Sequence, residues 1–215
     1  MGPLFALIFQ LILVCILSGI LGVIALGLTY FIAGKHKKKR KLFLAFTTPF
    51  LAIGTIYVLL LISSIAISFI KDVDIGIGDA WHVPLNGNSY LLMIDVMDDG
   101  DIMCGDEPVS LVSYVTHLQM VGDKVFLKNQ GGQFMTVDLV KCTTVSSTSI
   151  DAIKRIEGLA ELELVEIDDF YFKRKQEVAG AEMNIGFAVS LLVTLLAVFV
   201  FVRLVLYDWN PRKSV

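Results

Sequence analysis

The sequence predicts an α-helical membrane protein with three transmembrane helices and a small, mostly β (α+β) domain between the second and third helices. Residues 1–34, 42–70 and 183–202 contain no Asp, Glu, Lys or Arg, and about 20 apolar residues suffice to cross the hydrocarbon core of a bilayer. Residues 71–182, by contrast, hold 20 of the 21 acidic residues and show the alternation and turn residues typical of strands.

The composition excludes several classes of protein. Of the 215 residues, 55% are hydrophobic and 18% are charged, so the chain is more apolar and less charged than an ordinary soluble domain. Neither intrinsic disorder nor direct nucleic-acid binding fits this composition. The net charge of −3 divides into −11 within residues 71–182 and +8 in the remainder, which indicates two physically different parts.

The first apolar run predicts a transmembrane helix at about residues 4–33. A secretory signal peptide is the alternative, but such a peptide has a basic start and an apolar stretch of only about 7–15 residues. Nothing basic precedes this run, and the run is longer than that. We therefore expect residues 1–34 to form a retained helix whose amino terminus lies outside the cytoplasm.

The orientation follows from the basic segment at residues 35–41. A short loop with six basic residues beside two membrane ends is expected to stay in the cytoplasm, and these residues are Lys35, Lys37, Lys38, Lys39, Arg40 and Lys41. Residues 42–70 then form the second helix, 71–182 an extracytoplasmic domain, 183–206 the third helix and 207–215 a cytoplasmic tail. The basic segment is also the expected docking site for anionic lipid or an acidic cytoplasmic protein.

Residues 71–182 read as a small β domain. We expect a strand at 90–96, a tight turn at 98–101 leading into residues 102–103, and a second strand at 109–120. The turn N-Q-G-G between residues 124–128 and 133–140 predicts a hairpin. A short helix fits residues 149–157, because Thr148 and Asp151 have capping-box spacing and Gly158 follows. A last strand is expected at 162–167.

The segment before the third helix combines aromatic and basic residues. Phe170, Tyr171 and Phe172 suit the aromatic belt of a membrane interface, and Lys173, Arg174 and Lys175 could extend to anionic headgroups. The alternative is a solvated strand end with incidental aromatics. These three basic residues oppose the proposed orientation, but they are fewer than the six of the 35–41 segment.

Candidate chemistry in the domain is sparse. Cys104 and Cys142 are candidates for a disulfide, with two buried free thiols as the alternative. His82, His117 and these cysteines lack the close spacing of a zinc site, and residues 95–106 depart from a calcium loop at its third and twelfth places. No common catalytic motif occurs. We expect no enzyme activity, cofactor or metal.

The apolar helices carry small residues at helical spacing. Ser18, Gly22, Ala25 and Thr29 share one face of the first helix, and Ser64 and Ser68 repeat the pattern in the second. Such stripes allow close approach either among the chain's own helices or between copies in a homo-oligomer. Because no Asp, Glu, Lys, Arg or His lies at a bilayer centre, a coupled transporter is disfavoured. A pore lined by Ser and Thr from several copies stays open as a hypothesis.

Residues 78–102 read G-D-A-W-H-V-P-L-N-G-N-S-Y-L-L-M-I-D-V-M-D-D-G-D-I. This stretch resembles a pattern in uncharacterised bacterial inner-membrane proteins, G-D-x-W-x-x-P-L followed by a turn and I-D-V-x-D-x-G. The resemblance implies bacterial origin, an inner-membrane location and a β domain, but no activity. The layout also resembles the membrane subunit of Kiwa-type phage-defence systems, which would imply a role in antiviral or envelope-stress defence.

These observations favour a membrane-embedded sensor or scaffold. Its outer domain would meet a ligand, a partner or an envelope disturbance, and its helices would pass that state to a protein partner on the cytoplasmic side. The alternatives are an oligomeric channel-type effector and a toxin-immunity membrane protein. The expected partners are the lipid bilayer, further copies of the chain and a cytoplasmic protein, with no direct contact to nucleic acid.

Overall fold

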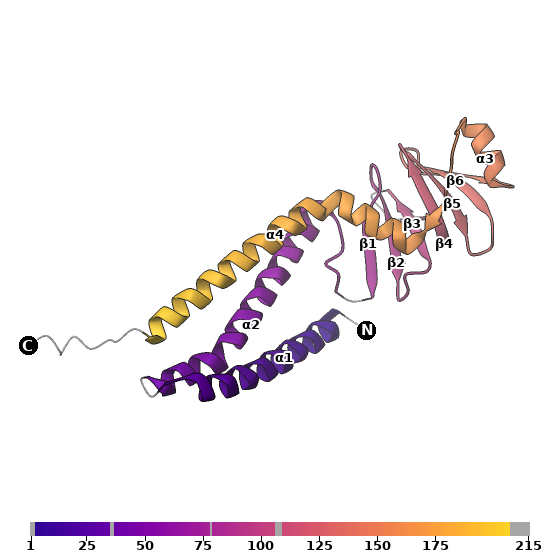
Figure 1. The fold of residues 1–215 in the computed structure, drawn as a ribbon. Coiled ribbons are helices and arrows are strands. Elements are labelled where there is room, and N and C mark those ends of the chain that lie inside the picture. The colour runs from indigo at the N-terminus through magenta and orange to yellow at the C-terminus, as the bar shows by residue number, and fades with distance from the viewer. Residues whose placement is uncertain (1–2, 35–36, 78, 106–108, 207–215) are drawn as a thin grey trace, which may run out of the picture. The chain divides into compact units, whose positions relative to one another are not determined.

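The structure, a computed structural model, describes residues 3–34, 37–77, 79–105 and 109–206 (Figure 1). It divides into two compact units. We call residues 65–182 the sheet unit, and residues 4–64 together with 183–206 the helical unit. Two helices, α2 (Lys38–Lys71) and α4 (Ile167–Leu206), contribute residues to both units.

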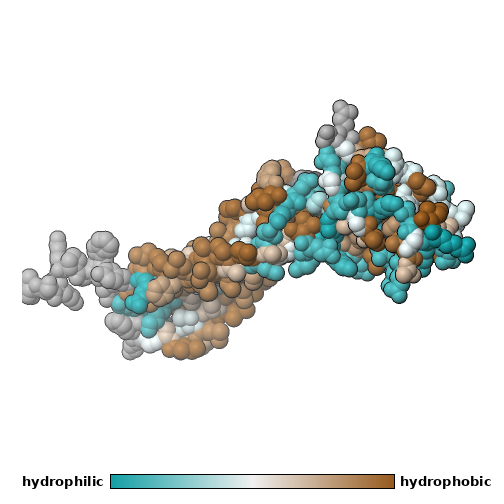
Figure 2. All heavy atoms as spheres, turned by 90° about the horizontal axis from the view of Figure 1, so that it is seen from above, coloured by the Kyte–Doolittle hydropathy of each residue, from teal (hydrophilic) through white to brown (hydrophobic). Residues whose placement is uncertain are grey.

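The helical unit contains α1 (Pro3–Ile32) and parts of α2 and α4. All three helices are long and apolar enough to cross a membrane, which indicates a membrane protein. Their outer surfaces are covered by large apolar side chains (Figure 2). Such a surface is stable against lipid and would be unstable in water.

Two helices begin earlier than the apolar runs predict. The second starts at Lys38 rather than near residue 42, so most of the expected basic loop is the first turn of α2. The third starts at Ile167 rather than at 183. The reason is amphipathicity: Ile167, Phe170, Tyr171, Val178 and Ala179 recur at helical spacing and face the sheet unit's core.

The sheet unit is an antiparallel meander. Its strands follow one another in chain order across the sheet, from β1 to β7. They are β1 (Ala80–Pro84), β2 (Ser89–Ile94), β3 (Gly100–Cys104), β4 (Val109–Val121), β5 (Lys124–Asn129), β6 (Phe134–Asp138) and β7 (Thr143–Ser147). The predicted strands around 90–96 and 109–120 and the predicted hairpin are confirmed, whereas β1 and β7 were not predicted.

The long strand β4 changes partners along its length. Its first half pairs with β3 as far as Val115, and from His117 onward it pairs with the two-residue strand β8 (Val165–Glu166) on that side. A register shift separates Val115 from His117, and Tyr114 has a φ of 58°. The predicted strand at 162–167 is therefore confined to β8, because α4 takes over at Ile167.

The short helix α3 (Ile150–Glu157) forms where a helix was predicted. Its amino-terminal cap is Ser149 rather than the expected Thr148, since the Ser149 hydroxyl accepts a hydrogen bond from the Ala152 amide at 3.2 Å. Gly158 closes the helix with a φ of 66°, a conformation that glycine adopts without steric cost.

Besides a small cluster of Phe126, Ile153 and Leu162, one large hydrophobic core holds the sheet unit together. It combines side chains of the strands with side chains of the first turns of α4. Fully buried members include Val83, Leu91, Met93, Ile102, Leu118, Leu127, Ile167 and Tyr171. Burial of each such side chain contributes about 1.5–3 kcal/mol, so the first part of α4 is a structural component of the sheet unit.

Candidate functional site

A buried polar cluster of the sheet unit joins α4 to the segment between α2 and β1. Asp74 lies in that segment, and Tyr171 and Lys175 lie one turn apart on α4. Lys175 Nζ donates to Asp74 Oδ1 at 3.1 Å, to Asp74 Oδ2 at 3.0 Å and to Tyr171 Oη at 2.8 Å. The Tyr171 hydroxyl donates a short hydrogen bond to Asp74 Oδ1. We call these three residues the joint.

The backbone around Asp74 fixes its side chain in place. The Asp74 amide donates to the His82 carbonyl at 3.2 Å, which anchors the segment to β1. The Gly76 amide donates to Asp74 Oδ2 at 2.7 Å. The Asp74 side chain is only 6% exposed and that of Lys175 15%. A buried charge pair of this kind persists only when hydrogen bonds satisfy both partners, as they do here.

Three further contacts hold the first part of α4 in place. Arg174 Nε donates to the Pro84 carbonyl at 3.1 Å and its Nη2 donates to the Leu85 carbonyl at 2.8 Å, so α4 is bonded to the end of β1. Lys71 Nζ lies 2.6 Å from Glu182 Oε1, which links the last residue of α2 to α4. All these bonds hold the first part of α4 to its neighbours within the sheet unit.

The surroundings of Tyr171 in the joint keep its hydroxyl protonated. Burial, and then the hydrogen bond to the Asp74 carboxylate, raise the pKa of Tyr171 far above its ordinary value. The hydroxyl therefore acts as a permanent hydrogen-bond donor. The lysine, the carboxylate and the tyrosine of the joint are bonded to one another and so attach α4 to the Asp74 segment.

The position of this cluster corrects the interfacial-anchor prediction. Phe170 and Tyr171 are buried in the core of the sheet unit, and Arg174 and Lys175 bind protein groups rather than extending outward. The aromatic and basic pattern alone predicts a membrane belt, because nothing in the sequence identifies Asp74 as the partner of Lys175. Phe172 and Lys173 are exposed, and for these two residues the anchor stays a prediction.

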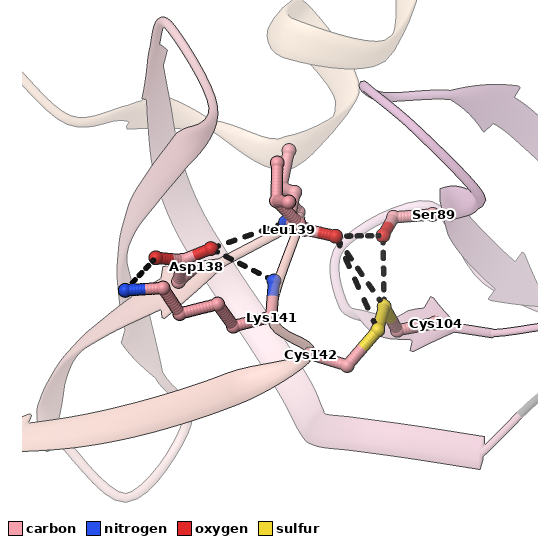
Figure 3. The surroundings of a disulfide bond; sticks show 7 residues. Ser89, Cys104, Asp138, Leu139, Lys141 and Cys142 are labelled. Atoms are coloured by element: carbon pink, nitrogen blue, oxygen red, sulfur yellow. Dashed lines mark hydrogen bonds and ion pairs between the residues drawn. A yellow bond between two sulfur atoms is a disulfide. The ribbon is translucent and has the colours of Figure 1, made fainter.

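Cys104 and Cys142 form a disulfide, with their α-carbons 5.9 Å apart (Figure 3). It connects the end of β3 to the turn between β6 and β7, so of the two alternatives left open by the sequence the structure contains the bridge. The Ser89 hydroxyl on β2 donates to the Leu139 carbonyl at 3.3 Å beside it. In the same turn, the Lys141 backbone amide donates to Asp138 and lowers the pKa of that carboxyl.

The two histidines of the sheet unit have separate partners. His82 Nε2 lies 3.6 Å from Asp72 Oδ1, and His117 Nδ1 lies 3.0 Å from the Thr116 hydroxyl. Within the described ranges, no three His, Cys, Asp or Glu side chains are grouped so that they could hold a metal ion.

The basic segment lies at the amino-terminal end of α2. Lys35 lies outside the described residues. Lys37 Nζ donates to the Leu206 carbonyl at 3.1 Å, and Lys38 Nζ lies 3.9 Å from the centre of the Tyr30 ring. Lys38, Lys39, Arg40 and Lys41 are helical. Positive side chains at a helix amino terminus oppose the helix dipole, so nearby anions would stabilise them.

The small-residue stripe of α1 takes part in packing within the chain. A β-carbon added to Gly22 would lie 2.8 Å from the Phe46 carbonyl oxygen of α2, so the two backbones approach closely there. Ser18 is buried and donates to the Val14 carbonyl at 2.7 Å, while Ala25 and Thr29 are half-buried. Ser64 and Ser68 are half-buried as well.

A comparable face of small residues, not predicted from the sequence, lies on α4. Gly186, Ser190 and Thr194 recur every four residues, and Ser190 and Thr194 are buried. The signal was present in the apolar run as small residues at steps of four.

Comparison with known protein families, with characterised proteins and with solved structures gives no match.

Proposed function

We propose that the protein is a sensor or scaffold subunit of a bacterial inner membrane, in which α4 passes the state of the sheet unit to the membrane helices. The observation that carries the proposal is the construction of α4. One helix of 40 residues places its first part in the core of the sheet unit, and its charge-free part, residues 183–202, belongs to the helical unit.

The joint supports this coupling role. Because Lys175, Tyr171 and Arg174 bond α4 to the Asp74 segment and to β1, movement of the sheet and movement of the helix are linked. A buried ion pair contributes little net stability compared with an apolar contact of the same volume. Its value is geometric specificity, since it fixes the rotation of α4 relative to the strands that it contacts.

Two observations support an extracytoplasmic sheet unit. The basic segment 35–41 is expected to stay in the cytoplasm, and a disulfide between Cys104 and Cys142 suits an oxidising compartment. Lys173, Arg174 and Lys175 oppose this orientation, but they are fewer than the six basic residues of segment 35–41.

On the cytoplasmic side, the basic segment would hold anionic lipid and an acidic face of a protein partner. We also propose that copies of the chain associate with one another. They would do so through faces of the apolar helices other than the face around Gly22. The resemblance in layout to a phage-defence subunit makes defence against phage or envelope stress the process in which we place the protein.

Affinity purification from cells that express the protein natively tests this function. Wild type is compared with a variant neutralised by Gln at all six basic residues of 35–41, and with Lys175→Met, which breaks the joint. Lys173→Met, an adjacent exposed change, is the control. We expect the neutralised variant to lose at least one protein that wild type and control both retain. If it keeps every partner of the wild type, the docking role is wrong.

A further inference from the structure

The outer edge of β1 is closed by other parts of the sheet unit. The Asp74 amide donates to the His82 carbonyl at 3.2 Å, and Arg174 Nε donates to the Pro84 carbonyl at 3.1 Å. Pro84 also has no backbone amide to offer to a further strand. The segment between α2 and β1, together with α4, therefore occupies the side of β1 on which another strand would add.

The outer edge of β7, at the opposite end of the strand order, is open. This strand pairs with β6 on one side, and its residues are exposed except for the half-buried Ser147. In the described parts of the chain, no hydrogen bond joins residues 143–147 to any element other than β6. An edge with unpaired amides and carbonyls is a template for another strand.

The edge of β7 also lacks the features that usually keep an exposed edge from pairing. Those features are charged side chains, proline and bulges. Residues 143–149 read T-T-V-S-S-T-S and contain no charge and no proline, and β6 and β7 pair without a shift in register. Residues 71–182 as a whole carry a net charge of −11, so this uncharged stretch is a place where two copies meet without repulsion between carboxylates.

Exposed aliphatic side chains lie on β7 and on the parts of the chain next to it. Among the described residues between 79 and 166, the four most exposed aliphatic side chains are those of Val109, Val140, Val145 and Ile156. Val145 belongs to β7, Val140 to the turn before it, and Ile156 to α3, which contacts β7. Val109 pairs with Cys104, which is bridged to the residue before β7. Apolar side chains gathered on one part of a surface indicate a contact site.

Both ends of β7 are held in place within the sheet unit. Cys142, immediately before the strand, is bridged to Cys104 at the end of β3. Ser149, two residues after the strand, accepts the hydrogen bond from the Ala152 amide that caps α3. A strand that is already ordered in this way loses little conformational entropy when it pairs with another one.

We propose that β7 pairs antiparallel with β7 of a second copy of the chain, so that two sheets join into one across a two-fold axis at Val145. The unpaired amides and carbonyls of the edge require an extended strand as their partner. A second copy supplies a strand that is equally exposed, uncharged and of the same length. Because this contact closes both open edges at once and the β1 edges are already closed, pairing ends at two copies.

The charges on either side of β7 favour the antiparallel direction. Lys141 lies two residues before the strand, and Asp151 lies four residues after it, in the first turn of α3. With Val145 opposite Val145, Lys141 of one copy lies opposite Ser149 of the other, close to Asp151 of that copy. A parallel arrangement would instead bring the two lysines together and the two aspartates together, and like charges repel.

Cysteine cross-linking of the full-length protein in detergent micelles tests the pairing. In a Cys15→Ser background, Val145→Cys places the thiols of two copies directly opposite one another, where β-carbons lie about 4.5–5.5 Å apart. Val140→Cys is the matched control, since Val140 is 68% exposed and Val145 60%. On mild oxidation we expect the disulfide-linked dimer of Val145→Cys to form at least about tenfold faster, because only its thiols face each other. Equal rates would overturn the proposal.

Charges introduced at the same position give a second test. Val145→Lys and Val145→Asp each place two like charges opposite one another, and energy transfer between labelled copies measures the effect. We expect each variant alone to dimerise at least about tenfold more weakly, and a mixture of the two to regain dimerisation, because opposite charges then face each other. Val140→Lys should change dimerisation by less than about twofold, because an exposed charge away from the pairing contributes little. A mixture of folded variants that dimerises no better than either one alone would contradict the pairing.

This contact goes beyond the proposed function, which places the association between copies in the apolar helices. It lies within the sheet unit and needs no cytoplasmic partner, so its failure and the failure of the proposed function are separable. Dimers that cross-link equally at positions 140 and 145 would reject the β7 pairing and leave association through the helices intact. Rapid cross-linking at 145 without partner loss in the purification experiment would retain the β7 pairing and reject the docking role.

Discussion

Lys175 and Asp74 are 101 residues apart in sequence, yet Lys175 Nζ lies 3.0 Å from Asp74 Oδ2 in a nearly buried ion pair. The pair joins the first turns of α4 to the segment that leads from α2 into β1. Since α4 continues as an apolar helix long enough to cross a membrane, this contact bonds the first part of that helix to the sheet unit.

Removal of the lysine should destabilise the sheet unit. Lys175→Met leaves the buried Asp74 carboxylate with an uncompensated charge, and we expect a loss of about 3–5 kcal/mol. The thermal unfolding midpoint of the full-length protein in detergent micelles, followed by circular dichroism, measures the effect. Lys173→Met is the matched control, because that side chain is exposed. Adding Asp74→Asn to Lys175→Met should restore part of the loss, and an unchanged midpoint in Lys175→Met would contradict the role of the pair.

The neutral tyrosine of the joint predicts alkaline sensitivity. Its folded-state pKa is raised above the ordinary value of 10.0, so the stability that it contributes is fully present below pH 10. That stability is lost as pH rises from about 10 toward the folded-state value, by at most about 1.4 kcal/mol per pH unit. Denaturant unfolding between pH 7 and 11 should therefore show a shallower alkaline loss in Tyr171→Phe than in wild type. Parallel curves for the two proteins would show that Tyr171 is not the titrating group.

The disulfide closes a loop between residues 38 positions apart. Its removal in Cys104→Ala/Cys142→Ala should lower the free energy of unfolding by about 4 kcal/mol on the chain-entropy model. Urea titration of the full-length protein measures this, and reduced wild type should match the variant. Mass spectrometry after maleimide labelling adds an independent check, because both cysteines should react only after reduction and unfolding.

The contact between α1 and α2 predicts opposite outcomes for two glycines. In Gly22→Ala the new methyl group would lie 2.8 Å from the Phe46 carbonyl oxygen, so the helices must separate. In Gly27→Ala the methyl group meets nothing within 4 Å, and the change gains the higher helix propensity of alanine. We expect a lower thermal midpoint for the first variant and an unchanged or higher one for the second. Equal midpoints would rule out close packing at Gly22.

Local patterns predicted much of this fold. Uncharged runs predicted the three long helices. Alternation of apolar and polar residues predicted β2 and β4, and the N-Q-G-G turn predicted the β5–β6 hairpin. Strand β7 was not predicted, because Thr143–Ser147 lacks alternation of apolar and polar residues and is exposed along most of its length. The start of α4 was missed although Ile167, Phe170 and Tyr171 have helical spacing, because the aromatic and basic run suggested a membrane interface instead.

The joint itself had no local signal. Asp74 and Lys175 carry nothing in their neighbouring residues that identifies them as partners, and only the three-dimensional fold brings them together. Pairing between distant charges is set by tertiary structure, which sequence periodicity does not encode.

The central claim, that α4 couples the sheet unit to the membrane helices, is tested most directly by cross-linking far from the joint. Phe43 of α2 and Phe201 of α4 lie in the helical unit with ring centres 6.5 Å apart. Residue 201 is 26 residues, or about 39 Å of helix, beyond Lys175. Cysteines at these two positions, in a Cys15→Ser background, should form a disulfide on mild oxidation in nanodiscs.

Coupling predicts that Lys175→Met changes the rate of this cross-linking by roughly fivefold, corresponding to about 1 kcal/mol transmitted along the helix, whereas Lys173→Met leaves it unchanged. Equal rates in wild type, Lys175→Met and Lys173→Met would show that the sheet unit and the membrane helices are uncoupled, and would contradict the account.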